Sequence, residues 1–345
     1  MKRYRITPTT SPSAARPLLW LVACSLVAVH ASIGSAQSAQ VTAEAEPTLV
    51  AEKEASKFLR IRKNASGDPV SMQTSIARYR PDQGDVIVDL IGAVHIGEGD
   101  YYQRLNKQFD LYDVVLYELV APQGTRVPKG GKKESTGSPL DLISWMQGQA
   151  KSTLGLESQL EKVDYQKAHF VHADLSPTEM GQKMAERGDN ALTVGLTAFA
   201  EMLRKQNKMA QSATENGVAQ MTGADLMDML DNPLELKKMM AKQFETSGVM
   251  EEGLGDTLNQ LLVVDRNAAA MKVLQKQIVS GKKKIAVFYG AAHMPDFEKR
   301  MADELGLRPD KHVWIDAWDL TKAGESPLEG GTTGLMLQMM RQLSK

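Results

Sequence analysis

The chain has 345 residues, of which 42% are hydrophobic and 24% charged, and its formal net charge at pH 7 is −1. This length allows one large domain or two small ones, and the balanced charge gives no electrostatic reason to expect a nucleic-acid partner. Cys24 is the single cysteine, so an internal disulfide is excluded.

Residues 1–36 have the features of an export signal. Four basic residues come before the apolar stretch PLLWLVACSLVAV, and the small residues GSA end at Ala36. This order is typical of a cleaved signal peptide, and about 13 apolar residues fall short of the roughly 20 that a membrane helix needs. Cleavage would remove Cys24 and four basic residues but no acidic ones, which brings the net charge to about −5. We expect a periplasmic or extracellular protein.

The stretch LVAC at residues 21–24 permits an alternative, a lipoprotein signal with a lipid on Cys24. Membrane association is expected only in that case. Residues 37–56 are rich in Ala, Glu, Gln and Ser without an apolar pattern, which is typical of a flexible linker. A single folded domain is expected from residue 57 to residue 345.

The first part of this domain predicts a strand, a helix and a strand. VIVDLIGAV (86–94) is an apolar run of buried-strand type, residues 100–112 have apolar positions at helical spacing, and VVLYELV (114–120) is again strand-like. A strand, a crossover helix and a strand of this length form a right-handed βαβ unit with parallel strands. A basic loop is expected at residues 123–139.

Residues 156–280 predict a long helical insert. Ten of the 19 methionines lie between residues 180 and 250, which indicates adaptable core packing or, alternatively, a groove for an apolar or peptide ligand. One helix start is well marked, because Ser176 can cap it, Pro177 suits its first position and Glu179 completes a capping box.

A second βαβ unit is predicted near the end of the chain. KKIAVFYGAA has a strand pattern, DFEKRMADELG a helix pattern capped by Asp296 and closed by Gly306, and HVWIDAWDL a strand pattern. The expected fold is therefore α/β: two βαβ-containing halves form a central mixed or mostly parallel sheet that helices flank, with the helical insert between them.

Both predicted units carry a Gly-x-x-His turn at the end of their first strand. The turns are Gly92 to His95 in GAVH and Gly290 to His293 in GAAH. Ligands of open α/β sheets bind beyond the carboxyl ends of the strands. If the two strands of the first unit are neighbours, Glu118 and His95 lie over the same edge. The glycines allow a sharp turn or the close approach of a ligand.

Two imidazoles and a carboxylate facing one cleft form the ligand set of a catalytic divalent-metal site, here His95, Glu118 and His293. A lone histidine at a strand end is more often a hydrogen-bonded structural residue. His172 and Asp174 could enter the same cleft, although a structural role is the simpler interpretation of His172.

The segments GAVHIGEGDYYQRLNKQFDLYDVVLYELV, LVVDRN and FYGAAHMPDFEKRM resemble the TraB/GumN family, which is related to the TIKI proteins and more distantly to the erythromycin-esterase and ChaN-like group. The resemblance covers about residues 84–320. It implies Mn²⁺- or Co²⁺-dependent protease chemistry, with His95, Glu118 and His293 around the metal. It also implies that Arg266, next to Asn267, stabilises an oxyanion.

The leading hypothesis is therefore an exported hydrolase that uses Mn²⁺, Co²⁺ or Zn²⁺ on a peptide or small-molecule substrate. A protein that binds haem or another ligand without catalysis is the alternative, since ChaN-like relatives are associated with haem. A third hypothesis is an interaction protein on the same fold.

Overall fold

The computed structural model of the protein describes residues 57–122, 124–131, 154–190, 193–194, 196–197, 200, 232–246 and 258–323. All of these residues belong to one compact unit. The expected signal segment with Cys24, the linker at 37–56, part of the basic loop and much of the Met-rich stretch lie outside the described residues. No helix among the described residues is long and apolar enough to span a membrane.

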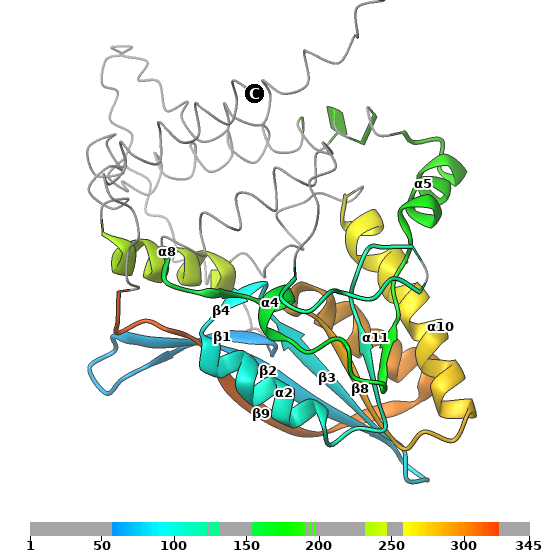
Figure 1. Ribbon diagram of the computed structural model, residues 1–345, viewed down its shortest axis with the longest axis horizontal. Coiled ribbons are helices and arrows are strands. Elements are labelled where there is room, and N and C mark those ends of the chain that lie inside the picture. The colour runs from blue at the N-terminus through cyan, green and yellow to red at the C-terminus, as the bar shows by residue number, and fades with distance from the viewer. Residues whose placement is uncertain are drawn as a thin grey trace, which may run out of the picture. The chain divides into compact units, whose positions relative to one another are not determined.

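A mixed seven-stranded sheet forms the centre, in the order β1-β2-β3-β8-β5-β7 with β9 paired to β2 (Figure 1). Its strands are β1 (Leu59–Lys63), β2 (Pro69–Pro81), β3 (Ile87–Ala93), β5 (Val114–Tyr117), β7 (Phe170–His172), β8 (Lys284–Gly290) and β9 (Leu307–Asp319). The four strands β3, β8, β5 and β7 are parallel, whereas β2 is antiparallel to β1, β3 and β9. The predicted mixed α/β sheet is confirmed.

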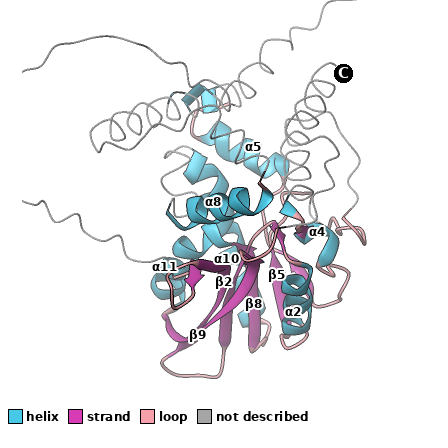
Figure 2. Cartoon of the chain, turned by 90° about the vertical axis from the view of Figure 1, so that its left-hand side faces the viewer, coloured by secondary structure: helices cyan, strands magenta, loops and turns pink. Residues whose placement is uncertain are grey.

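Helices cover both faces of this sheet. The described helices are α2 (Gly99–Phe109), α4 (Gln159–Lys162), α5 (Pro177–Glu186), α8 (Pro233–Thr246), α10 (Asp265–Val279) and α11 (Met294–Leu305), with short turns η2 (Gln260–Val264) and η3 (Ala291–His293). A small two-stranded sheet joins β4 (Ile96–Gly97) to β6 (Glu157–Ser158). Figure 2 shows α2 on one side of the central sheet and α10 and α11 on the other.

The two faces have separate hydrophobic cores. Phe288 of β8 packs in the core under α2, with Leu105 and Phe109 of that helix. Its neighbours Val287 and Tyr289 point the other way, into the core under α10 and α11. Side chains on both faces of the parallel strands are therefore buried. This burial explains why these strands are continuous apolar runs in the sequence.

The two crossovers explain why helices lie on both faces. From β3 the chain passes through α2 to β5, and from β8 it passes through α11 to β9, in the opposite direction along the sheet. A right-handed connection places its helix on a face that depends on this direction, so the two helices lie on opposite faces. In neither unit are the two strands neighbours: β8 separates β3 from β5, while β2 and β3 separate β9 from β8.

Two details differ from the sequence-based expectation, and two agree. The region 156–280 is not uniformly helical, because β7 within it forms the edge of the central sheet. Asp296 does not cap α11, which begins at Met294, whereas Gly306 closes it with a left-handed φ of 64° as expected. The capping box of Ser176 and Glu179 at the start of α5 is confirmed.

Candidate functional site

The predicted site residues lie at the carboxyl edge of the parallel strands. His95 follows β3, His293 follows β8 and Glu118 follows β5. The neighbours β3 and β8 have crossovers that leave in opposite directions, and ligands of open α/β sheets bind at such a switch point. The strands that carry His95 and Glu118 are not neighbours, because β8 lies between them and places His293 in the middle.

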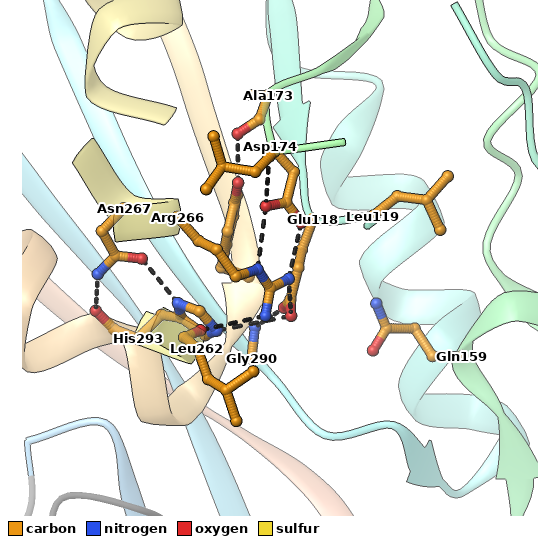
Figure 3. A network of polar contacts seen from close by, with 12 residues as sticks. Glu118, Leu119, Gln159, Ala173, Asp174, Leu262, Arg266, Asn267, Gly290 and His293 are labelled. Carbon is orange, nitrogen blue, oxygen red and sulfur yellow. Dashed lines mark hydrogen bonds and ion pairs between the residues drawn. The ribbon is translucent and has the colours of Figure 1, made fainter. Parts of the chain in front are cut away.

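Five side chains meet at this edge and form what we call the switch-point site: Glu118, Asp174, Arg266, Asn267 and His293 (Figure 3). They come from four places far apart in the sequence, namely the ends of β5, β7 and β8 and the first turn of α10. All five are largely buried, so their polar atoms need partners from the protein, from water or from a ligand.

Glu118 is the centre of the switch-point site. Its Oε1 accepts a hydrogen bond from Nη2 of Arg266 at 2.6 Å, and its Oε2 accepts one from the backbone N–H of Gly290 at 2.8 Å. Burial raises the pKa of Glu118, but the charge of Arg266, with contributions from His293 and His95, outweighs burial and holds this pKa well below its usual range. The carboxylate is therefore ionised, and it is a weak base.

Arg266 joins the two carboxylates of the site. Its Nε and Nη2 donate to the two oxygens of Asp174 at 3.0 and 2.7 Å, a bidentate pair, while Nη2 also donates to Glu118. A fourth bond runs from Nη1 to the carbonyl of Leu262 in η2, the π-helical turn just before α10. Such turns are frequent at functional sites. Four of the five guanidinium N–H groups are thus used.

His293 is held in one orientation by Asn267. The side-chain amide nitrogen of Asn267 donates to the carbonyl of His293 at 2.9 Å and to Oδ2 of Asp296 at 2.8 Å. The amide oxygen therefore faces Nδ1 of His293, 2.7 Å away. Because that oxygen can only accept, Nδ1 must carry a hydrogen. In the neutral ring, Nε2 then has a lone pair, and it lies 3.5 Å from Oε1 of Glu118.

His95 does not join this network. Its side chain is exposed, and its imidazole makes no hydrogen bond to another described residue. Its backbone carbonyl accepts from the N–H of Gln159 at 2.9 Å, next to the pairing of β4 with β6. It is still close enough to contribute to the lowered pKa of Glu118.

The two further candidates have different positions. Asp174, 3% exposed, is part of the switch-point site through its bond to Arg266. His172 is not: its Nε2 lies 2.5 Å from the carbonyl of Leu119, and its buried Nδ1 has no hydrogen-bond partner among the described residues.

The two motif glycines are not needed for an unusual backbone conformation, since neither has a positive φ. A Cβ on Gly290 would lie 3.4 Å from Oε2 of Glu118, whereas the nearest atoms to a Cβ on Gly92 are 3.6 Å away. The backbone of Gly290 thus lies against the Glu118 carboxylate, and the close approach of a ligand to either glycine stays a prediction.

Asp296 is a site residue that the sequence-based interpretation missed. It lies in the first turn of α11 and accepts from both Asn267 and Nε of Arg300, the latter at 2.7 Å. A signal was available, because Pro295 favours the first turn of a helix and so indicates a helix start before Asp296.

The switch-point site has donor atoms for a divalent cation at one pair of positions. Bonds of about 2.0–2.2 Å to one tetrahedral ion separate two ligand atoms by about 3.3–3.6 Å. The 3.5 Å between Nε2 of His293 and Oε1 of Glu118 fits that separation. Among the described residues, no group of three or more His, Cys, Asp or Glu side chains is placed to hold a metal ion. The three-ligand set that includes His95 stays a prediction.

A separate cavity of about 640 Å³ lies elsewhere along the sheet. Its lining includes Arg104, Lys237, Glu98 and Asp316, and no residue of the switch-point site. Charged side chains in this lining pair with one another, as in the 2.7 Å contact of Lys237 with Glu98.

Comparison with known proteins adds no relative: no family model, no curated protein and no solved structure matches the chain. The resemblance to the TraB/GumN family, the haem alternative and the interaction alternative all stay predictions from sequence.

Proposed function

We propose that this chain is an exported hydrolase of TraB/GumN type that acts at the switch-point site with a bound divalent cation (Mn²⁺, Co²⁺ or Zn²⁺). The observation that carries the proposal is the 3.5 Å approach of Nε2 of His293 to Oε1 of Glu118. Asn267 holds the hydrogen on Nδ1, so in the neutral ring two acceptor atoms face each other. Two acceptors at this distance are compatible only when a proton on Nε2 or a metal ion lies between them.

The charge of the site is consistent with a cation beside Glu118. Glu118 and Asp174 contribute two negative charges, and Arg266 contributes one positive charge. Charges this deeply buried are stable when they are paired, and the group as a whole carries one negative charge in excess. A cation beside Glu118 balances it, and this cation is either a proton on His293 or a metal ion.

The chain's own residues would have distinct tasks. Glu118 and His293 would hold the ion, and His95, at the end of the neighbouring strand, is the expected third ligand. When bound, a divalent ion supplies a Lewis acid for a scissile carbonyl. Because Glu118 is a weak base, we assign it to binding and not to proton abstraction. Arg266 mainly positions the two carboxylates, and its remaining N–H is the group available to a developing oxyanion.

Calorimetric titration of the chelator-stripped protein with Mn²⁺, Co²⁺ and Zn²⁺ tests the proposal. We expect one saturable site, lost in His293→Ala and Glu118→Gln and weakened in His95→Ala. Asn267→Ala should weaken binding about 10- to 100-fold, as removal of a partner behind a metal ligand usually does. His312→Ala is the matched control, because His312 is exposed and its side chain bonds the backbone carbonyl of Lys57, far from the site.

Absence of binding, or binding that His293→Ala leaves unchanged while circular dichroism shows a folded protein, would contradict the metal site. Hydrolysis is measured in parallel on fluorescently labelled casein and on 4-nitrophenyl acetate. If the metal binds and neither probe is cleaved by the loaded protein, the site is a binding site and the hydrolase proposal fails.

A further inference from the structure

Gln159 is a buried polar residue for which the proposed chemistry has no use. It is 4% exposed and begins α4, where its backbone N–H donates to the carbonyl of His95. Its side-chain Nε2 donates to the hydroxyl of Tyr165 at 2.9 Å. Gln159 is thus anchored on both sides, by the first Gly-x-x-His turn and by a buried tyrosine.

The other end of this amide has no hydrogen bond. Oε1 of Gln159 is buried and lacks a partner among the described residues. Such atoms are rare in folded proteins, because burial removes their bonds to water, and each one needs an explanation. In the orientation in which Nε2 of the amide donates to Tyr165, the orphan atom is the acceptor Oε1, and a donor satisfies it.

The amide of Gln159 points toward the switch-point site. Figure 3 shows Gln159 beside the network, with its amide end turned toward Glu118 and Gly290. The electrostatics agree with this placement: burial raises the pKa of Tyr165, and the charge of Glu118 raises it further, so the tyrosine that holds Gln159 lies near the Glu118 carboxylate.

We propose that Gln159 is a specificity-determining residue, whose Oε1 accepts a hydrogen bond from the N–H of an amide substrate bound at the switch-point site. The proposal rests on the proposed hydrolase function. A secondary amide offers an N–H donor beside its carbonyl, so it can satisfy Gln159 while the carbonyl faces Glu118 and His293. The corresponding ester has no donor there and leaves Oε1 unpaired, which is a strong basis for discrimination.

The first test compares two probes that differ only by N–H and O, namely 4-nitroacetanilide and 4-nitrophenyl acetate. Gln159→Met removes the acceptor at similar volume, and we expect kcat/KM for the anilide to fall about tenfold or more while that for the ester stays within about twofold. Gln159→Glu keeps an acceptor and should retain anilide hydrolysis. Gln166→Met is the control, because Gln166 lies in the same segment but its side chain bonds the carbonyl of Val127. An equal loss on both probes, or no loss on either, overturns the proposal.

The second test does not depend on turnover. In protein labelled with ¹⁵N-glutamine, the side-chain signal of Gln159 is identified by its disappearance in Gln159→Met. We expect N-methylacetamide, which has a donor, to shift this signal, and N,N-dimethylacetamide, which has none, to leave it in place. Equal effects of both amides, or no effect of either, overturn the assignment of Gln159. A selective shift without any hydrolysis would instead count against the hydrolase function alone.

Discussion

The two Gly-x-x-His turns have nearly the same sequence and very different surroundings. His95 is exposed and its imidazole makes no hydrogen bond to another described residue, whereas His293 is 5% exposed and is held by Asn267 beside Glu118. The difference arises from the segment after each turn and from the elements that pack on it. The first turn continues into the short pair of β4 and β6, while the second runs directly into η3 and α11, against α10. A local motif therefore places a histidine at a strand end, and its packing partners decide what it can do.

We expect the largest effect from replacing Arg266, which lies beside the second turn in the switch-point site. Arg266→Ala leaves Glu118 and Asp174 buried without their shared cation, so we expect a loss of about 3–5 kcal/mol in the free energy of unfolding. Urea denaturation measures it. Arg308→Ala is the control, since the side chain of Arg308 is 70% exposed and its ion pair with Asp82 should contribute about 0–1 kcal/mol. Similar small losses in both variants would show that the buried network does not stabilise the fold.

The second prediction compares the two histidines directly. His293→Ala leaves the oxygen of Asn267 unpaired and removes a ring that packs edge-to-face on Tyr289, with centroids 5.2 Å apart. We expect a destabilisation of about 2–3 kcal/mol in metal-free protein. His95→Ala should change stability by less than about 0.5 kcal/mol, because it removes only an exposed side chain. Equal values for the two variants would contradict the assigned difference between the turns.

The smallest effect concerns acid stability. The pKa of Glu118 is lowered in the folded protein, so its ionised form stabilises the fold at pH values above the unfolded pKa of about 4.3. That contribution is lost as the pH falls below about 4.3 toward the lowered folded pKa. Between pH 5 and pH 3 the loss should be about 1–2 kcal/mol, measured by urea denaturation at each pH. Glu118→Gln should remove this part of the pH dependence. If the variant and the parent lose the same free energy of unfolding between pH 5 and pH 3, Glu118 is not ionised in the folded state at low pH.

Much of the fold could be predicted from local patterns. The apolar runs of β3, β5 and β8, the helical spacing of α2 and the capping box at Ser176 all depend on neighbouring residues, and each is present in the structure. The start of α11 was misjudged, because a polar residue in the first turn looks like a cap when its distant partner, Asn267, is not known. The edge strand β7 has only three residues, too few to show a period within a helical region.

The candidate site was only partly predictable. Glu118, Arg266, Asn267 and His293 could be named from motifs, and they do meet. The bidentate bond of Asp174 to Arg266 and the bond of Asp296 to Asn267 could not be predicted from local patterns. Each of these depends on segments separated by tens of residues or more along the chain.

The sequence by itself determined where strands end, which turns carry histidines and which helix is capped, because these are properties of side chains within a few residues of one another. Only the tertiary structure decided that β8 lies between β3 and β5, that His293 is buried while His95 is exposed, and that one guanidinium joins two carboxylates. Those outcomes depend on strand order and on burial. The free energy of burying a charge depends on which distant groups surround it, and no local pattern encodes that.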